Sequence, residues 1–140
     1  EQNVSLSEFE ELTKKNDSFD KELDRRIEEY GKTHNTCVVE SRLAWHFIPD
    51  SVKIKLTCPD DVRLKRIADR EGKDLSQVMA ETVHREKAIK ERFKEYYDID
   101  FDAETEDDKF DLVLDTSLAD LEGIVLGITN FIKTRESNLI

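Results

Sequence analysis

The sequence contains few of the residues on which several common kinds of site depend. Of its 140 residues, four are glycine, two are cysteine and three are histidine. Cys37 and Cys58 are too few for a disulfide framework and too far apart for a C-x-x-C site, so we expect two buried thiols. The three histidines share no metal-ligand spacing, so we expect them to be ordinary surface or core residues.

The sequence also has no glycine-rich phosphate loop. Gly31-Lys32-Thr33 imitates the last three residues of a P-loop, but the first glycine of that motif would fall at position 26, which is Arg26. The triplet ends a predicted helix, whereas a P-loop precedes one. The other glycines, at positions 72, 123 and 127, form no such loop either.

The sequence has no long apolar run, and it has fewer basic than acidic residues. No apolar run approaches the length that spans a bilayer, and the first residues do not resemble a signal peptide, so we expect a cytoplasmic protein without a membrane partner. The net charge is −11, with 33 acidic and 22 basic residues, which disfavours nucleic acid as a partner. An anion site must therefore be a local cluster of arginines. We expect a monomer or a weak dimer.

Three short apolar runs predict strands. Thr36 to Val39 is β-branched, Val52 to Leu56 alternates with lysines, and Phe110 to Leu114 is a third run of this kind. Helical patterns separate these runs, so we predict an α/β fold in which helices flank a parallel sheet.

The helices are predicted from apolar spacing and from capping residues. Gly31 and Gly72 are expected to end helices, Pro59 to begin one, and Asp74 to cap one with Gln77 completing a capping box. The expected helices cover about residues 5–12, 18–30, 59–71, 75–97 and 118–134, with Asp115-Thr116-Ser117 capping the last, and residues 98–108 form an exposed acidic loop anchored by Ile99 and Phe101.

We expect a single domain with three parts. Residues 1–35 form a helical arm, residues 36–58 and 109–140 form the core, and residues 59–108 form lid helices and the acidic loop.

A carboxylate and a guanidinium emerge together at the carboxyl end of the first predicted strand. Glu40-Ser41-Arg42 directly follows Val39, and open α/β sheets hold their ligands at this end of their strands. Glu40 has two possible roles, which the sequence does not separate. It could orient a Mg²⁺ ion through water, or it could only hold Arg42 in place.

Arginines are the most informative residues in this acidic chain. Arg85 and Arg92 are seven residues apart, so they project from one helix face about 10 Å apart. Arg66 and Arg70 are four apart on the preceding helix. These guanidiniums could converge with Arg42 on one phosphate group, because their fork suits phosphate oxygens. Alternatively, they pair with nearby glutamates on solvated helices, and spacing alone favours that alternative.

Taken together, these residues resemble the cytidylate kinases, and specifically their short archaeal-type branch. The resemblance covers nearly the whole chain, and its blocks occur in the order of the family. These blocks are residues 7–12 (SEFEEL), 19–26 (FDKELDRR), 38–44 (VVESRLA), 66–73 (RIADREGK), 85–86 (RE), 91–100 (ERFKEYYDID) and 110–117 (FDLVLDTS).

The resemblance implies transfer of the γ-phosphoryl group of ATP to CMP or dCMP, with Mg²⁺, by a P-loop nucleoside monophosphate kinase. It also implies a role for each matching residue. Arg42, with Ser41 beside it, would bind the CMP phosphate or base edge, and Arg25 and Arg26 would belong to the arm that closes over the monophosphate. Arg85 and Arg92 would clamp phosphates as catalytic residues, Arg66 and Arg70 would border the ATP site, and Asp115, Thr116 and Ser117 would lie near the adenine. Glu40 is the candidate metal-binding residue from its place after the first strand, not from the resemblance.

The sequence departs from the family at three places. Ser41 stands where glycine is usual, and Ile89 stands where a polar residue is usual between the two lid arginines. The family's first strand and P-loop have no counterpart in these 140 residues, so we expect them to be inactive on their own. An alternative from another class is a non-catalytic relative or fragment that binds nucleotide or serves as an interaction module.

Overall fold

The structure is a computed structural model that describes residues 18–34 and 36–137. The helix expected at about residues 5–12 lies outside these residues. The chain divides into two compact units, Glu1–Ser51 and Val52–Ile140. The predicted division into a helical arm, a core and a lid follows the family resemblance, and it stays a prediction.

In the first unit, helix α2 (Ser18–Thr33) packs against the short helix α3 (Ala44–Phe47). The prediction that Gly31 ends the helix is wrong, because α2 continues to Thr33. Gly31 instead allows a close approach: a Cβ at this position would lie 2.7 Å from Cγ1 and 2.8 Å from Cδ1 of Ile48. The sequence Gly31-Lys32-Thr33 forms the last turn of α2, which confirms that it is not a P-loop.

Replacing Gly31 with alanine should destabilise the first unit. Alanine favours a helix by about 1 kcal/mol over glycine, but overpacking a tight contact costs about 1–3 kcal/mol. Rotation of the Ile48 side chain cannot relieve the clash, since its Cγ2 would also lie 3.0 Å from the new Cβ. Chemical denaturation of Gly31→Ala and of the control Gly127→Ala measures the difference. The nearest atom to a Cβ at Gly127 is 3.9 Å away, so a Gly31→Ala protein as stable as this control would contradict the account.

The strand predicted at Thr36–Val39 is wrong. The backbone from Thr36 to Ser41 forms neither strand nor helix, and the Val38 side chain is 96% exposed. The expectation of two buried thiols is wrong for the same reason, because Cys37 in this segment is exposed, and Cys58 is only half-buried. A β-branched run becomes a strand only when a neighbouring strand accepts and donates its hydrogen bonds. No strand of the described chain pairs with this run.

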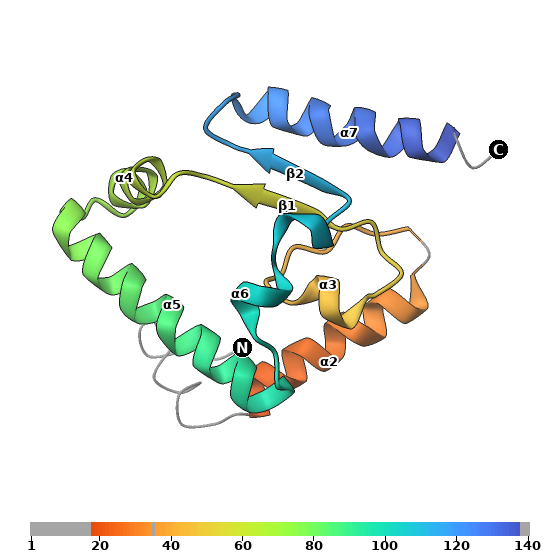
Figure 1. Cartoon of the computed structure of the whole chain (residues 1–140), viewed down its shortest axis with the longest axis horizontal. Coiled ribbons are helices and arrows are strands. Elements are labelled where there is room, and N and C mark those ends of the chain that lie inside the picture. The colour runs from red at the N-terminus through yellow and green to blue at the C-terminus, as the bar shows by residue number, and fades with distance from the viewer. Residues whose placement is uncertain (1–17, 35, 138–140) are drawn as a thin grey trace. The chain divides into compact units, whose positions relative to one another are not determined.

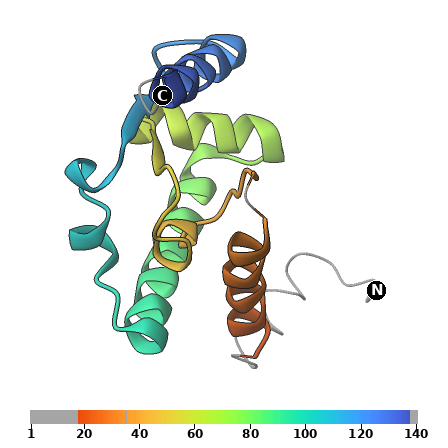
Figure 2. The same cartoon turned by 90° about the vertical axis from the view of Figure 1, so that its right-hand side faces the viewer.

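In the second unit, two parallel strands form the predicted sheet. Strand β1 (Ile54–Thr57) pairs with β2 (Leu112–Asp115), and the register places Ile54 opposite Leu112 and Thr57 opposite Asp115. Figures 1 and 2 show helix α7 (Leu121–Ser137) running beside this sheet. A Cβ at Gly127 of α7 would lie 3.9 Å from Leu114, so the helix packs closely on β2. Parallel strands with flanking helices confirm the predicted α/β class.

Helices α4 (Asp60–Glu71) and α5 (Leu75–Tyr97) follow β1 and pack against each other. Gly72 ends α4 in the left-handed conformation with φ 64°, as predicted. Asp74 caps α5 as predicted, because its carboxylate accepts the Ser76 N–H at 2.8 Å. The predicted capping box is wrong, since the Gln77 amide donates to Glu81 instead, at 2.7 Å. Pro59 is the N-cap residue of α4 and not its first helical residue.

The acidic segment after α5 is more ordered than the predicted loop. It contains helix α6 (Phe101–Glu104) and a 3₁₀ turn η1 (Asp107–Lys109), and in Figure 2 it runs beside α5. The two predicted anchors account for this order. Ile99 is 2% exposed, and the ring of Phe101 lies 5.6 Å from that of Phe93 on α5. Lys90 of α5 adds an ion pair with Asp102, at 2.7 Å.

The buried core is small, and much apolar surface is left open. The buried apolar side chains of the described residues are Leu43, Ala68, Val78, Ile89 and Ile99. Leu118 and Leu121, by contrast, are 82% and 79% exposed. Even so, none of the described helices is both long enough and apolar enough to cross a membrane.

Candidate functional site

The second unit brings polar groups together where its two strands end. Thr57 and Asp115 are the last residues of β1 and β2, and they lie opposite each other. The next residue along the chain, Thr116, ties the two ends together: its N–H donates to the Thr57 carbonyl at 2.8 Å, and its hydroxyl donates to the same oxygen at 3.0 Å. This is the edge of the sheet at which α/β proteins bind ligands.

Arg66 reaches this edge from α4. Its Nη1 donates to the Thr116 hydroxyl at 3.0 Å, and its Nη2 donates to the Thr116 carbonyl at 2.8 Å. Nη1 also lies 3.6 Å from Sγ of Cys58, the residue that follows β1. The side chain remains exposed, so a ligand can reach the guanidinium while its orientation is held.

Asp115 closes the turn after β2. Its Oδ1 accepts the Ser117 N–H at 2.8 Å and the Ser117 hydroxyl at 2.7 Å, and these bonds lower the pKa of the Asp115 carboxyl. The prediction that residues 115–117 cap the last helix is therefore wrong. Helix α7 begins at Leu121, and the carboxylate that accepts a hydrogen bond in its first turn is Asp120, from the Gly123 N–H at 2.9 Å.

Arg70 lies one turn beyond Arg66 on α4, and its surroundings differ. Arg70 is exposed and forms an ion pair with Glu71, at 3.4 Å. Of the two arginines expected to border the ATP site, only Arg66 reaches the strand ends through hydrogen bonds. Arg70 fits the alternative in which arginines pair with acids on a solvated helix.

Arg85 and Arg92 both lie on α5, as the spacing predicts. Seven residues of helix separate them by about 10 Å along the axis. Arg85 is exposed and Arg92 is half-buried. Ile89 lies between them and is only 9% exposed. The isoleucine that stands where the family usually has a polar residue is therefore part of the core.

In the first unit, Arg25 and Arg26 share one carboxylate on α2. Arg25 Nε lies 2.8 Å from Glu22 Oε2, and Arg26 Nε lies 2.8 Å from Glu22 Oε1, while Arg25 also reaches Glu29 at 2.9 Å. The hydrogen bond from Arg25, followed by that from Arg26, lowers the pKa of Glu22 from 4.5 to about 2. Arg25 and Arg26 are therefore exposed, and Glu22 and Glu29 balance their charge.

Glu40, Ser41 and Arg42 follow the irregular segment of the first unit. The Ser41 hydroxyl accepts the Leu43 N–H at 3.2 Å, and the Trp45 indole N–H donates to the Arg42 carbonyl at 2.9 Å. These bonds fix the backbone on both sides of Arg42, and Leu43 is only 1% exposed. The Arg42 side chain is exposed, and within the described residues it forms no ion pair. Its guanidinium is therefore presented from a fixed backbone.

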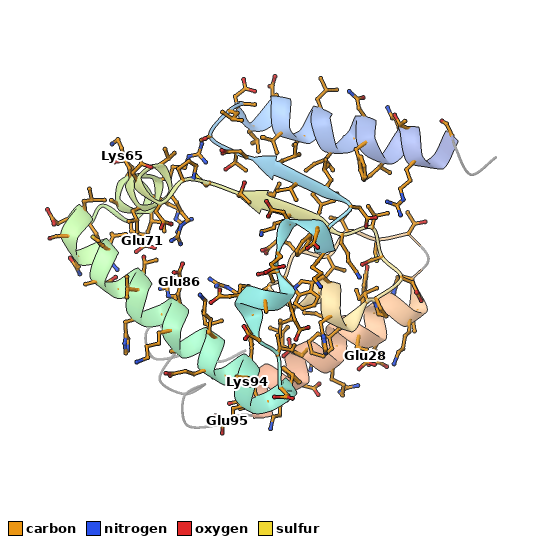
Figure 3. The ribbon with its side chains drawn as sticks, in the orientation of Figure 1. Glu28, Lys65, Glu71, Glu86, Lys94 and Glu95 are labelled. Atoms are coloured by element: carbon orange, nitrogen blue, oxygen red, sulfur yellow. The ribbon has the colours of Figure 1, made fainter. Side chains whose placement is uncertain are left out.

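Sequence reasoning missed the ionic contacts that join α4 to α5. Arg63 of α4 donates to Glu86 of α5 at 2.6 Å, and Lys73, just after α4, binds Glu81 of α5 at 2.7 Å. Arg63 also donates to Asp60 within α4, at 2.8 Å. Glu86 is labelled on α5 in Figure 3. These partners raise the pKa of Arg63, with the Asp60 hydrogen bond the largest cause. Nothing in the sequence distinguishes Arg63 from the other helix cations, because its partner Glu86 lies 23 residues away.

The described residues contain no group of three or more histidine, cysteine or acidic side chains that could enclose a metal ion. Glu40 is a single exposed carboxylate. Mg²⁺ keeps several waters and often takes only one or two carboxylates beside substrate phosphates. A single carboxylate such as Glu40 is compatible with that mode of binding, and its role at a Mg²⁺ ion stays a prediction.

Comparison with known proteins identifies relatives of the chain. The model of the cytidylate kinase-like family matches residues 2–118. Cytidylate kinase of Methanosphaera stadtmanae is 35% identical over 97% of this chain and 77% of its own length. The enzyme of Halobacterium salinarum is 41% identical over 73% of this chain and 54% of its own length. That of Methanocaldococcus jannaschii is 37% identical over 89% and 70%. No solved structure matches the chain.

The matches to these relatives test some of the predictions made from the sequence. The chain spans about half to three quarters of their length. The matches confirm the resemblance, and they favour a kinase over an interaction module. The roles of individual site residues stay predictions. With its α/β fold and a family model that matches most of its length, the chain belongs to the cytidylate kinase-like family.

Proposed function

We propose that the complete protein transfers the γ-phosphoryl group of ATP to CMP or dCMP in the cytoplasm. The observation that supports this proposal most directly is the Arg66–Thr116 arrangement at the carboxyl ends of β1 and β2. It places an exposed, oriented cation where sheets of this class bind ligands. The family assignment supplies the reaction, and the relatives named above carry the name cytidylate kinase.

The reaction requires positioning and charge neutralisation more than covalent chemistry. A phosphate oxygen of CMP attacks the γ-phosphorus of ATP, a new P–O bond forms, and the bond to the β,γ-bridging oxygen breaks. The products are CDP and ADP. Arginines stabilise the charge on the transferring group, since a guanidinium donates two parallel hydrogen bonds to phosphate oxygens.

The proposed site residues divide into those that would contact CMP and those that would contact ATP. Arg42 would bind the phosphate or base edge of CMP, with Ser41 fixing the backbone beside it through its bond to Leu43. Arg66 would contact ATP, with Arg70 one turn further along the same helix. Thr116 and its neighbours Asp115 and Ser117 would form the wall near the adenine.

The remaining proposed roles belong to the lid helix α5 and to the residue that would orient Mg²⁺. Arg85 and Arg92 would clamp the phosphates from α5, where the Arg63–Glu86 ion pair joins this helix to α4. Glu40 would orient Mg²⁺ through water. When bound, the ion would neutralise negative charge on the ATP phosphates.

A panel of nucleoside monophosphates tests the proposal. The complete protein is incubated with Mg²⁺, ATP and one monophosphate at a time, and ADP formation is followed. We expect CMP and dCMP to accelerate ADP formation at least about tenfold more than AMP or GMP, because a site that hydrogen-bonds a base edge rejects other bases strongly. No acceleration by any monophosphate would refute the proposed function.

The Glu22 carboxyl reports whether the arm binds phosphate. Its pKa of about 2 reflects the hydrogen bonds from Arg25 and Arg26, and their stabilising contribution is present above pH 4.5 and is lost as the pH falls towards 2. If the CMP phosphate accepts the hydrogen bonds of Arg25 and Arg26 in place of Glu22, the Glu22 pKa should rise towards 4.5. A ¹³C NMR titration of the complete protein with saturating CMP measures this shift.

Two internal controls accompany that titration. Cytidine lacks the phosphate, so it should leave the Glu22 pKa at its low value. Glu28 is paired with Lys32 at 2.6 Å, which lowers its pKa, and it should not respond to CMP. A Glu22 pKa that stays near 2 with CMP bound would show that Arg25 and Arg26 do not hold the monophosphate.

A further inference from the structure

We propose that Thr116 is a positioning residue that fixes the Arg66 guanidinium at the carboxyl ends of β1 and β2 in the orientation that binds ATP. This inference rests on the proposed function, in which Arg66 contacts ATP. It assigns to Thr116 a role through Arg66 that is separate from any contact of its own with the adenine.

Two hydrogen bonds to one residue define the plane of the guanidinium. Nη1 of Arg66 donates to the Thr116 hydroxyl at 3.0 Å, and Nη2 donates to the Thr116 carbonyl at 2.8 Å. Because the guanidinium is planar and rigid, two bonds from different nitrogens leave it little freedom to rotate. A single bond would not fix this orientation.

Thr116 is itself anchored to the neighbouring strand. Its N–H and its hydroxyl both donate to the carbonyl of Thr57, at 2.8 Å and 3.0 Å. A threonine hydroxyl has one proton and two lone pairs. The proton goes to Thr57 and a lone pair accepts from Arg66, so one hydroxyl connects the strand end to the guanidinium.

No carboxylate of the described residues forms an ion pair with Arg66, although the Asp115 carboxyl lies near enough to interact with its charge. Within the described chain Arg66 binds threonine oxygens and a cysteine sulfur. The nearby Asp115 uses its Oδ1 for Ser117. By contrast, Arg70 pairs with Glu71 on the same helix. Neutral partners orient Arg66 while its positive charge remains available to an anionic nucleotide.

The test removes the hydroxyl without changing the shape of the side chain. In the complete protein, Thr116→Val deletes the bond from Arg66 Nη1 and the bond to Thr57, whereas Thr116→Ser keeps a hydroxyl. The matched control is Thr129→Val on α7, whose hydroxyl donates to the Val125 carbonyl at 2.8 Å. Isothermal titration calorimetry measures Kd for ATP and for CMP with each variant.

We expect Thr116→Val to weaken ATP binding about tenfold, because a hydrogen bond to a charged group contributes more than a neutral one. CMP binding should change less than about twofold, and Thr116→Ser should restore ATP binding to within about threefold. Thr129→Val should bind both nucleotides like the unaltered protein. Unchanged ATP binding by Thr116→Val, or a parallel loss of CMP binding, would overturn the inference.

NMR of the arginine side chains provides a readout that does not depend on nucleotides. Hindered rotation should give separate Nη signals for Arg66 in the unaltered protein and in Thr116→Ser, and one averaged signal in Thr116→Val. Averaged signals in the unaltered protein would overturn the inference even where the valine variant fails to fold. Because ATP binding is measured apart from phosphoryl transfer, a protein that binds ATP through this pair without phosphorylating CMP would refute the proposed function alone.

Discussion

Replacing Arg42 with alanine in the complete protein is expected to lower kcat/KM for CMP by about 10²- to 10³-fold. Arg42 would bind the acceptor substrate, and a lost charged donor in a phosphoryl-transfer site has an effect of this size. Steady-state kinetics with CMP varied at saturating ATP measure it. The KM for ATP should change little, since the affected interaction is with the acceptor.

The structure indicates that this change leaves the fold intact. The Arg42 side chain is exposed and forms no ion pair with the described residues, while its carbonyl accepts the Trp45 indole N–H. This backbone hydrogen bond does not depend on the side chain, so the free energy of unfolding should change by less than about 0.5 kcal/mol.

A second arginine serves as the matched control. Arg135 lies near the end of α7 and forms an ion pair with Asp111, at 2.5 Å. Arg135→Ala should reduce stability slightly and leave kcat/KM within about twofold. If Arg42→Ala also retains its kcat/KM, the assignment of Arg42 to the acceptor substrate is wrong.

Replacing Ile99 with alanine should produce the largest loss of stability in the second unit. Ile99 is 2% exposed, and its N–H donates to the Phe93 carbonyl at 3.3 Å, just beyond the end of α5. Truncating a fully buried isoleucine removes apolar burial and leaves a cavity, which costs about 2–5 kcal/mol. The acidic segment should open from α5 more often, because Phe101 and the Lys90–Asp102 ion pair would then hold it without Ile99.

An exposed leucine shows whether burial is the cause. Leu118 is 82% exposed, so Leu118→Ala should change the free energy of unfolding by less than about 0.5 kcal/mol. Urea denaturation of both variants, with hydrogen exchange of residues 98–109, makes the comparison. Similar losses for both variants would show that Ile99 does not anchor the segment.

The elements that could be predicted from sequence are those governed by local rules. Gly72 ends α4 because glycine adopts a positive φ readily, and Asp74 caps α5 because its side chain reaches the N–H two residues later. The strands β1 and β2 were recognisable by their apolar runs, and both formed.

The elements that were predicted wrongly depend on neighbours that the sequence does not show. The run at Thr36–Val39 has the composition of a strand but no paired neighbour in the described chain. Gly31 resembles a helix terminator, yet its role is to accommodate Ile48, seventeen positions further along the chain. In both cases a tertiary contact, present or absent, overrides the local preference.

The candidate site shows the same limit. Arg66 and Thr116 were both expected near ATP through the family resemblance, but the hydrogen bonds between them join residues 50 positions apart. Spacing on a helix could not separate Arg66 from Arg70, which pairs with an acid. Only the folded arrangement of β1, β2 and α4 distinguishes the two.

The central claim is that the complete protein moves the γ-phosphoryl group of ATP directly to a cytidine monophosphate. ATP labelled with ³²P in the γ-phosphate, incubated with CMP, Mg²⁺ and the complete protein, tests it most directly. We expect the label in the β-phosphate of CDP, with one ADP formed for each labelled CDP. Label found only in inorganic phosphate, or remaining in ATP, would contradict the claim.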